Sequence, residues 1–221
     1  MADPTHAWLR KVIDSPALTS LAEQVGAQAG KSTRSVVQGI QGSSTALLAG
    51  ALSMRVQRPV LLVVPHVDDA DDAQDDIELF SESGYAVHAR RFGALEVLPG
   101  ESNVSLELLA ERLAVVEAIA HGDWPRQFDT TVFGQVLIAP VQALMQSVPE
   151  PSVLAQMSLT IKPGLDMPPA KLIDWLVEAG YQRVDAIDQP GDFAVRGGII
   201  DIYPPAGTTT DNAGGGAVQA E

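Results

Sequence analysis

The segment GIQGSSTALLAG, residues 39–50, has the outline of a phosphate-binding loop followed by a helix. In the G-x-x-x-x-G-K-[S/T] loop, backbone N–H groups hold the phosphates, the lysine neutralises phosphate oxygens and the hydroxyl binds magnesium. Counted from Gly39, these last three positions hold Ser44, Thr45 and Ala46 instead of glycine, lysine and a hydroxyl residue. The sequence therefore predicts a degenerate loop that takes no nucleotide cofactor, with weak anion binding at the helix N-terminus left open. The degenerate loop comprises Gly39, Gly42, Ser44, Thr45 and Ala46.

Other residue types that perform catalysis are sparse or scattered. The chain has no cysteine, and its four histidines stand far apart without metal-ligand spacing. It also shows no Ser/His/Asp arrangement and no Gly-x-Ser-x-Gly elbow. We expect no metal and no catalytic residues. The formal net charge of −14, from 28 acidic and 14 basic residues, disfavours direct nucleic-acid binding and is compatible with a basic protein partner.

An acidic segment, residues 67–83, contains no lysine or arginine. One interpretation is a docking face for a basic partner. The other is the solvated side of a helix, because Ala70, Ala73, Ile77 and Phe80 recur at helical spacing and place the carboxylates opposite. We prefer the second interpretation.

The elements that surround the loop follow an alternating order. The apolar runs 58–65 and 134–140 are typical of fully buried parallel strands, and 85–92 reads as a third strand. Helices are expected over 67–83, 102–122 and 141–148. The order predicts a parallel sheet covered by helices on both faces. The buried stripe expected for the second of these helices is Leu106, Leu109, Leu113, Val116 and Ala120.

The pattern changes near residues 149–152, PEPS. We expect a strand over 157–164, a helix over 165–180, and alternating segments in 181–205 separated by a Pro190-Gly191 turn and a bend or bulge at Gly197-Gly198. The fold class is thus α/β, followed by a small α+β domain. The predicted organisation is a helical lead-in over 1–34, an α/β domain over 35–148, the small domain over 149–205 and a disordered tail over 206–221. No export signal or membrane-length apolar run occurs, which predicts a cytoplasmic protein.

The succession of the degenerate loop, RPVLLVVP, ERLAVVEAI, VLIAPVQALMQSVP and GYQRVDAIDQPGDFAVRGGIIDIYPP resembles the N-terminal region of the bacterial transcription-repair coupling factors. The resemblance spans about residues 35–205, and its last stretch is the most specific. In that family the first domains are similar to the excision-repair protein UvrB. The first domain is an ATPase relic, and the small domain is similar to the UvrB surface that docks onto UvrA.

Two features favour this family over UvrB itself. UvrB retains an intact phosphate loop, whereas the loop here is degenerate. UvrB also carries a long, tyrosine-rich hairpin that clamps DNA. In this chain, only GALEVLPGESN, residues 93–103, separates the second strand from the long helix. This segment has no tyrosine and is too short for such a hairpin.

The resemblance implies a non-catalytic module that recruits UvrA to stalled RNA polymerase. In the family, the polymerase-binding module and the translocase motor lie downstream of this region. We therefore expect an N-terminal fragment, in which the domains that contact RNA polymerase and DNA are missing. Whether the small domain is complete stays open. The alternative is a P-loop ATPase or a UvrB-like helicase fragment in DNA repair. Autoinhibitory contacts within a longer chain are a third possibility.

The resemblance also selects candidate partner-binding residues. Arg183 and Arg196 stand where UvrB-like domains present arginines to UvrA, and arginine suits bidentate contacts with carboxylates. The alternative is that both pair with aspartates of their own domain, namely Asp185, Asp188, Asp192 or Asp201. Gly197 and Gly198 are expected mainly to permit positive φ, which also allows a partner close approach. Phe193 and Ile199 are candidate apolar anchors, although strand alternation places one of them in the core.

Overall fold

The computed structural model describes residues 7–27, 30, 34–95, 105–120 and 134–204. The chain divides into two compact units. Unit 1 comprises Met1–Ala94 and Gly122–Gln146, and unit 2 comprises Leu95–His121 and Ser147–Glu221. The expected disordered tail, 206–221, lies outside the described residues.

Unit 1 is built on a three-stranded parallel sheet with the order β1-β3-β2. The strands are β1 Val60–Val64, β2 Val87–Arg91 and β3 Gly134–Pro140, and Val136 of β3 is level with Val60 and Ala89. Helices α3 Ser43–Val56 and α4 Val67–Glu82 pack against the sheet, and the short α6 Val141–Leu144 follows β3 directly. These elements confirm the predicted strands, their parallel pairing and the α/β class.

Only the central strand is fully buried. All seven residues of β3 are buried, whereas Leu61 and Val63 of β1 are 52% and 45% exposed. The prediction of complete burial for β1 was therefore wrong. A continuous apolar run does not distinguish an edge strand from a central one, because that difference depends on which strands pair on either side.

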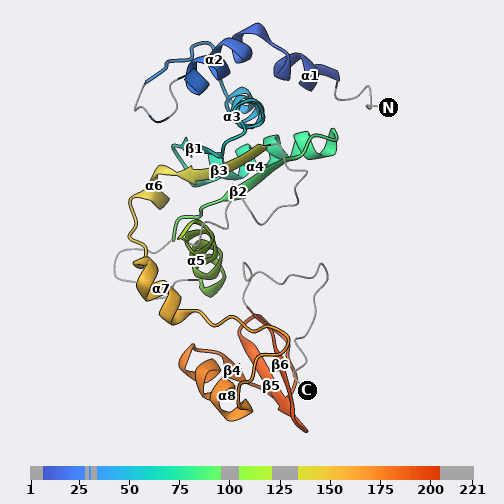
Figure 1. The fold of residues 1–221 in the computed structure, drawn as a ribbon, viewed down its shortest axis with the longest axis vertical. Coiled ribbons are helices and arrows are strands. Elements are labelled where there is room, and N and C mark those ends of the chain that lie inside the picture. Colours follow the sequence, from blue (N-terminus) through green and yellow to red (C-terminus); the bar gives the residue numbers. More distant parts are fainter. Residues whose placement is uncertain (1–6, 28–29, 31–33, 96–104, 121–133, 205–221) are drawn as a thin grey trace. The chain divides into compact units, whose positions relative to one another are not determined.

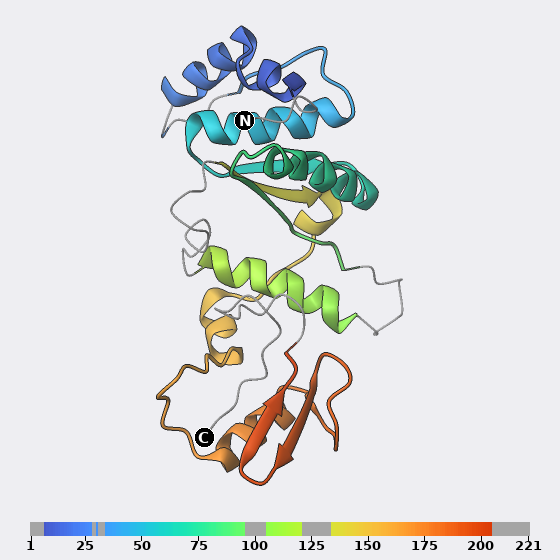
Figure 2. The same ribbon diagram turned by 90° about the vertical axis from the view of Figure 1, so that its right-hand side faces the viewer.

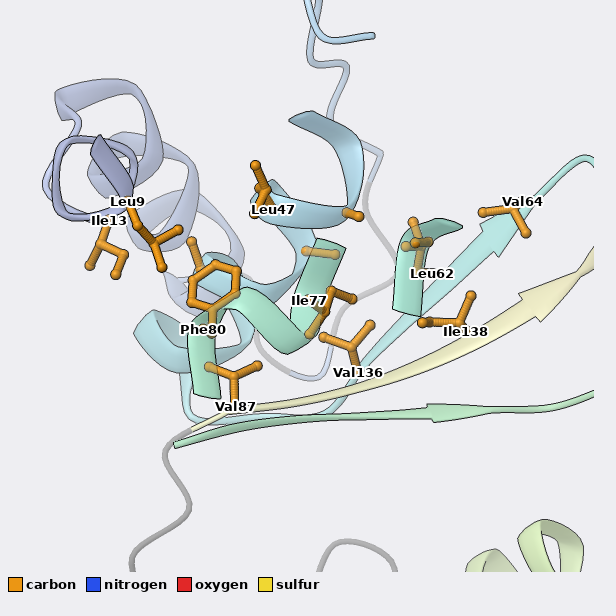
Figure 3. Packing of buried hydrophobic residues seen from close by; sticks show 14 of the residues in the cluster. Leu9, Ile13, Leu47, Leu62, Val64, Ile77, Phe80, Val87, Val136 and Ile138 are labelled. Atoms are coloured by element: carbon orange, nitrogen blue, oxygen red, sulfur yellow. The ribbon is translucent and has the colours of Figure 1, made fainter. Parts of the chain in front are cut away.

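The core of unit 1 lies between one face of the sheet and helices α3 and α4 (Figure 3). Phe80 and Ile77 of α4 are completely buried and face Val136 and Val87 of the sheet. Ala70 and Ala73 are buried on the same side of α4, and none of its acidic residues is buried, as the spacing predicts. The apolar face of this highly acidic helix attaches it to the fold, and Asp71 adds an ion pair with Arg91 of β2.

Two glycines allow close packing around α3. A Cβ on Gly50 would come within 2.7 Å of the Phe80 ring, so α3 and α4 touch there with no room for a side chain. A Cβ on Gly134 would come within 2.5 Å of Ser53 Oγ and 3.1 Å of the Met54 backbone nitrogen. Helix α3 is therefore in close contact with both its helical neighbour and the central strand.

Helices α1 Ala7–Ile13 and α2 Pro16–Ala27 lie on the far side of α3 from the sheet (Figures 1 and 2). Leu9, Ile13 and Leu18 join the core of unit 1. Arg55, near the end of α3, donates hydrogen bonds to the Ile13 backbone carbonyl at 2.8 and 3.3 Å. The N-terminal helices are thus an integral layer of unit 1.

Unit 2 contains α5 Leu106–Ala120, α7 Pro151–Met157 and α8 Pro169–Glu178. The alternating order of elements predicted that α5 covers the parallel sheet, but α5 groups with unit 2, where it contacts α7. Helices α3 and α4 pack against the sheet through the core of unit 1, which agrees with the expected helix-covered parallel sheet. The buried stripe of α5 also differs from the expected one. It consists of Arg112, Val115 and Ala118, because a helix that is apolar nearly all around does not specify one face by periodicity.

The second sheet has the order β4-β5-β6. Strand β4 Gln182–Arg183 pairs in parallel with β5 Asp192–Arg196, which pairs antiparallel with β6 Ile199–Ile202. Helix α8 packs beside this sheet (Figure 1). Its residues Leu172 and Leu176 form a core with Phe193 and Ile200.

Residues 158–164 do not form the predicted strand. Helix α7 ends at Met157, and the following segment joins neither sheet. Leu159 and Ile161 nevertheless pack against the core of unit 2. The alternating pattern therefore indicates that one side of this segment is buried. It does not indicate a strand here, because the segment pairs with no described strand.

Candidate partner-binding site

The degenerate loop has the turn of a phosphate loop, but it is closed by its own hydrogen bonds. Gly39 and Gly42 have φ values of 82° and 54°. Ser44 Oγ accepts a hydrogen bond from the Gln41 N–H at 2.8 Å and donates one to the Gln41 carbonyl at 2.6 Å. The Ser44 and Thr45 N–H groups donate to the carbonyls of Gln41 and Gly42. Three N–H groups in the region that would hold phosphates are therefore already bonded within the loop.

The hydroxyl position of the loop is part of the hydrophobic core. Ala46 is only 3% exposed and belongs to the apolar cluster of unit 1. A threonine here would insert a hydroxyl among apolar neighbours, where it loses hydration. The loop thus contributes a helix start to the architecture of unit 1, and its geometry offers little to a nucleotide. No group of three or more potential metal-ligating side chains occurs among the described residues.

Arg196 lies at the end of β5, where its guanidinium is bound to the backbone rather than to an aspartate. Its Nε donates to the Asp185 carbonyl oxygen at 3.1 Å, and Nη2 donates to the same oxygen. The side chain remains exposed. A guanidinium carries five N–H donors, so these two bonds leave three for another acceptor. The alternative that Arg196 is occupied by aspartate side chains of its own domain was therefore wrong.

Arg183 lies on β4, beside the start of β5, and is exposed. Its side chain forms no hydrogen bond or ion pair with any other described residue. None of the four nearby aspartates holds it, which removes the other half of the intradomain pairing alternative. Its full set of donors is free for a partner.

Of the two candidate apolar anchors, only one is accessible. Phe193 is completely buried between α8 and the sheet, so it cannot contact a partner while unit 2 is folded. Ile199, directly after the hairpin turn, is 43% exposed. The expectation that one of them lies in the core was correct, and the assignment of Phe193 as a contact residue was wrong. Phe193 instead supports the strand that carries Arg196.

Gly197 and Gly198 form the two-residue connection between β5 and β6. Their φ values are 55° and 92°, and Arg196 pairs directly with Ile199. Two consecutive residues with positive φ are the requirement of a type I′ hairpin turn, which explains the glycines. The expected bend or bulge is thus a tight hairpin turn. It places Arg196 and Ile199 side by side at the tip of the sheet.

The contacts of the loop that joins β4 to β5 involve Asp192, the first residue of β5, which was not among the candidate partner-binding residues. Asp192 is 3% exposed, and its Oδ2 accepts hydrogen bonds from the N–H groups of Asp188 at 3.2 Å and Gln189 at 3.0 Å. An aspartate after a Pro-Gly turn was the available signal, because aspartate side chains commonly bond nearby backbone N–H groups. The carbonyl of Asp185 carries no such signal, since any residue has a carbonyl.

The exposed residues Arg183, Arg196, Gly197 and Ile199 therefore share one small sheet, while the degenerate loop belongs to the other unit. An exposed apolar residue beside unpaired guanidinium donors suits contact with an acidic protein surface. In the described part of the chain, no helix is long and apolar enough to span a membrane.

Comparisons with known proteins relate this chain to one family. Residues 159–211 match the model of the UvrB interaction domain. The chain is 31% identical over 170 residues to the transcription-repair-coupling factor of Bacillus subtilis, an alignment that covers 76% of this chain and 13% of that protein. It is 33% identical over 165 residues to the Mycobacterium tuberculosis protein, with coverage of 74% and 12%. It is 28% identical over 166 residues to the Escherichia coli protein, with coverage of 75% and 13%.

The aligned region thus spans about an eighth of the length of these relatives. The small sheet with Arg183 and Arg196 lies inside the segment that matches the UvrB interaction domain. By sequence, this chain is similar to one part of the bacterial transcription-repair-coupling factors and, over residues 159–211, to the UvrB interaction domain, as its segment order predicts.

Proposed function

We propose that this chain is a non-catalytic interaction module of transcription-coupled nucleotide excision repair, which binds UvrA through the small sheet of unit 2. The observation that supports it most is the match of residues 159–211 to the UvrB interaction domain. Within this match, Arg183 and three N–H donors of Arg196 are free, and both side chains are exposed. In this proposal, Arg183, Arg196, Gly197 and Ile199 form the docking surface.

The chemistry of this surface predicts an acidic patch on UvrA. The chain as a whole carries a net charge of −14, and the small sheet with its β4–β5 loop also holds four aspartates, so the free guanidinium donors of Arg183 and Arg196 are what would attract an acidic group. Arginine binds carboxylates through two parallel hydrogen bonds, and such contacts are frequent hot spots of protein interfaces. Ile199 supplies an apolar contact that shields the ion pairs from water.

The same proposal assigns a separate role to each part of the chain. Residues 149–205 form the docking domain, and unit 1, with the N-terminal helices and the degenerate loop, forms a supporting domain derived from a nucleotide-binding fold. Contacts with RNA polymerase and DNA belong to regions of the longer relatives outside the aligned segment. The proposal includes a cytoplasmic location, where these partners are found.

The test is calorimetric titration of purified UvrA with the chain, its Arg196→Ala variant and the control Lys171→Ala. Lys171 is an exposed base on α8 of the same unit, so its removal changes the net charge equally. Arg196→Ala should weaken binding by about 2 to 5 kcal/mol if the arginine pairs with a desolvated acid, and Lys171→Ala should leave binding unchanged. Equal affinities for Arg196→Ala and the unaltered chain would refute the assignment.

The competing proposal is a nucleotide-dependent repair enzyme. The hydrogen bonds between Ser44 and Gln41 argue against it, because they engage the backbone where phosphates would bind. Purified chain that hydrolyses ATP, free of contaminating ATPase, would favour this rival over an interaction module.

A further inference from the structure

Two side chains of β5 form hydrogen bonds with the loop between β4 and β5, residues 184–191. One side chain is at the start of the strand and the other is at its end. At the start of β5, the Asp192 carboxylate binds the N–H groups of Asp188 and Gln189. At the end of β5, Arg196 binds the carbonyl of Asp185. The loop thus lies along β5, with one side chain of the strand fixing each part.

The Asp192 carboxylate is part of the packed interior of unit 2. Its side chain is almost fully buried, and a buried carboxylate is costly unless hydrogen-bond donors surround it. Two backbone N–H groups meet this need, and in return the loop residues that carry them are fixed. The backbone of the strand adds a third tie, because the Asp192 N–H donates to the Gln189 carbonyl at 3.1 Å.

We infer that Asp192 is a positioning residue for UvrA docking, which acts through the loop on Arg196. By fixing residues 188 and 189, Asp192 sets the place of the Asp185 carbonyl. This carbonyl accepts from Nε and Nη2 of Arg196 and therefore orients its guanidinium, with the remaining donors free for an acidic group. This inference rests on the proposed function, since it assigns a role within the same docking surface.

Orientation of the guanidinium before binding removes part of the entropy cost of ordering a long side chain at an interface. That cost for one flexible side chain corresponds to a factor of about ten in affinity. Asp192→Ala frees the loop and should weaken UvrA binding about tenfold. Asp192→Asn should bind within about threefold of the unaltered chain, because its amide oxygen can still accept from both N–H groups.

The matched control is Asp188→Ala. This change also removes one carboxylate from the region, but the Asp188 N–H that bonds to Asp192 belongs to the backbone and is retained. Asp188 is exposed, and its variant should keep the affinity of the unaltered chain. An equal loss in Asp188→Ala and Asp192→Ala would show that only charge matters, which overturns the inference.

Two readouts separate positioning from a general structural effect. In an Arg196→Ala background, Asp192→Ala should cause no further loss of affinity, because its effect passes through Arg196. In the chain without UvrA, nuclear magnetic resonance should show faster solvent exchange of the Arg196 Nε–H in Asp192→Ala than in the unaltered chain or Asp188→Ala. Should Asp192→Ala fail to fold, Asp192→Ser, whose hydroxyl reaches less far, replaces it.

An unchanged Nε–H exchange rate, or fully additive losses in the double variant, would overturn the inference. If the unaltered chain does not bind UvrA, the proposed function fails, and the exchange measurement alone then decides whether Asp192 positions Arg196. The two failures are therefore distinguishable.

Discussion

Arg183 and Arg196 differ in what each contributes to the folded chain. The Arg183 side chain has no hydrogen-bond partner among the described residues, whereas the Arg196 guanidinium is bound to the Asp185 carbonyl. Arg183→Ala should change the free energy of unfolding by less than about 0.5 kcal/mol, as for other exposed sites. Arg196→Ala should lower it by about 1 kcal/mol through the lost hydrogen bonds. Urea unfolding of both variants checks this, and equal stabilities would contradict the Arg196 contact.

Tyr181 makes the stability of unit 2 depend on pH in the alkaline range. Burial raises the pKa of Tyr181 above its usual value, so the folded state holds the phenol proton more tightly than the unfolded state. The resulting stability is present below the unfolded pKa of about 10 and is lost as pH rises through the folded pKa. Unfolding midpoints at a series of pH values should fall more steeply above pH about 10 than those of Tyr181→Phe. Parallel pH profiles would contradict this.

At the residue scale, the sequence predicted which types of residue form the site but not all of their contacts. Alternation indicated that Phe193 or Ile199 is buried, yet only the packing of α8 shows that it is Phe193. The aspartates near Arg196 suggested ion pairs, whereas the acceptor is a carbonyl. Backbone acceptors leave no mark in the sequence, because every residue carries one.

Among the elements, the contact between α3 and α4 depends on Gly50. A Cβ there would overlap the ring of Phe80, which is completely buried and has nowhere to move. Gly50→Ala should therefore destabilise unit 1 by about 1 to 3 kcal/mol despite the higher helix propensity of alanine. The control is Gly26→Ala in α2, where nothing lies within 4 Å of the added Cβ. It should stabilise by up to about 1 kcal/mol. Thermal unfolding checks the prediction: the melting temperature should fall for Gly50→Ala and rise for Gly26→Ala. Shifts of the two melting temperatures in the same direction would contradict it.

The degenerate loop should take no nucleotide. A ligand present at 100 times its dissociation constant would stabilise the fold by about 2.7 kcal/mol, so magnesium-ATP binding would appear as a melting shift. We expect no shift for the unaltered chain. Ser44→Gly with Thr45→Lys removes the two Ser44 side-chain hydrogen bonds and restores the charge, and should recover phosphate binding at most. Ala46 is best left unchanged because it lies in the core. A clear shift for the unaltered chain would contradict this account of the loop.

At the scale of elements, the helices and strands with strong patterns were predictable. The spacing in α4 indicated its buried face correctly, because polar and apolar residues are sharply divided there. The face of α5 was not predictable, since its apolar residues surround the helix. The edge position of β1 and the unpaired segment 158–164 depend on long-range pairing, which local alternation does not encode.

At the scale of the whole molecule, the two candidate features lie in different units. Unit 1 carries the degenerate loop, and unit 2 carries the exposed arginines within the match to the UvrB interaction domain. The sequence predicted both folds and the family. It did not predict that α5 groups with the second unit, because its position in the alternating order suggested a helix of the parallel sheet.

The central claim is that the small sheet of unit 2 binds UvrA through Arg183 and Arg196. Its most direct test compares the affinity of UvrA for two charge-reversed chains with equal net charge. One carries Arg183→Glu and Arg196→Glu; the other carries Lys162→Glu and Lys171→Glu, at exposed positions of the same unit outside the sheet. Circular dichroism should first show that both remain folded. We predict that the arginine pair loses detectable binding and that the lysine pair binds as the unaltered chain does. Equal affinities for the two variants would contradict the claim.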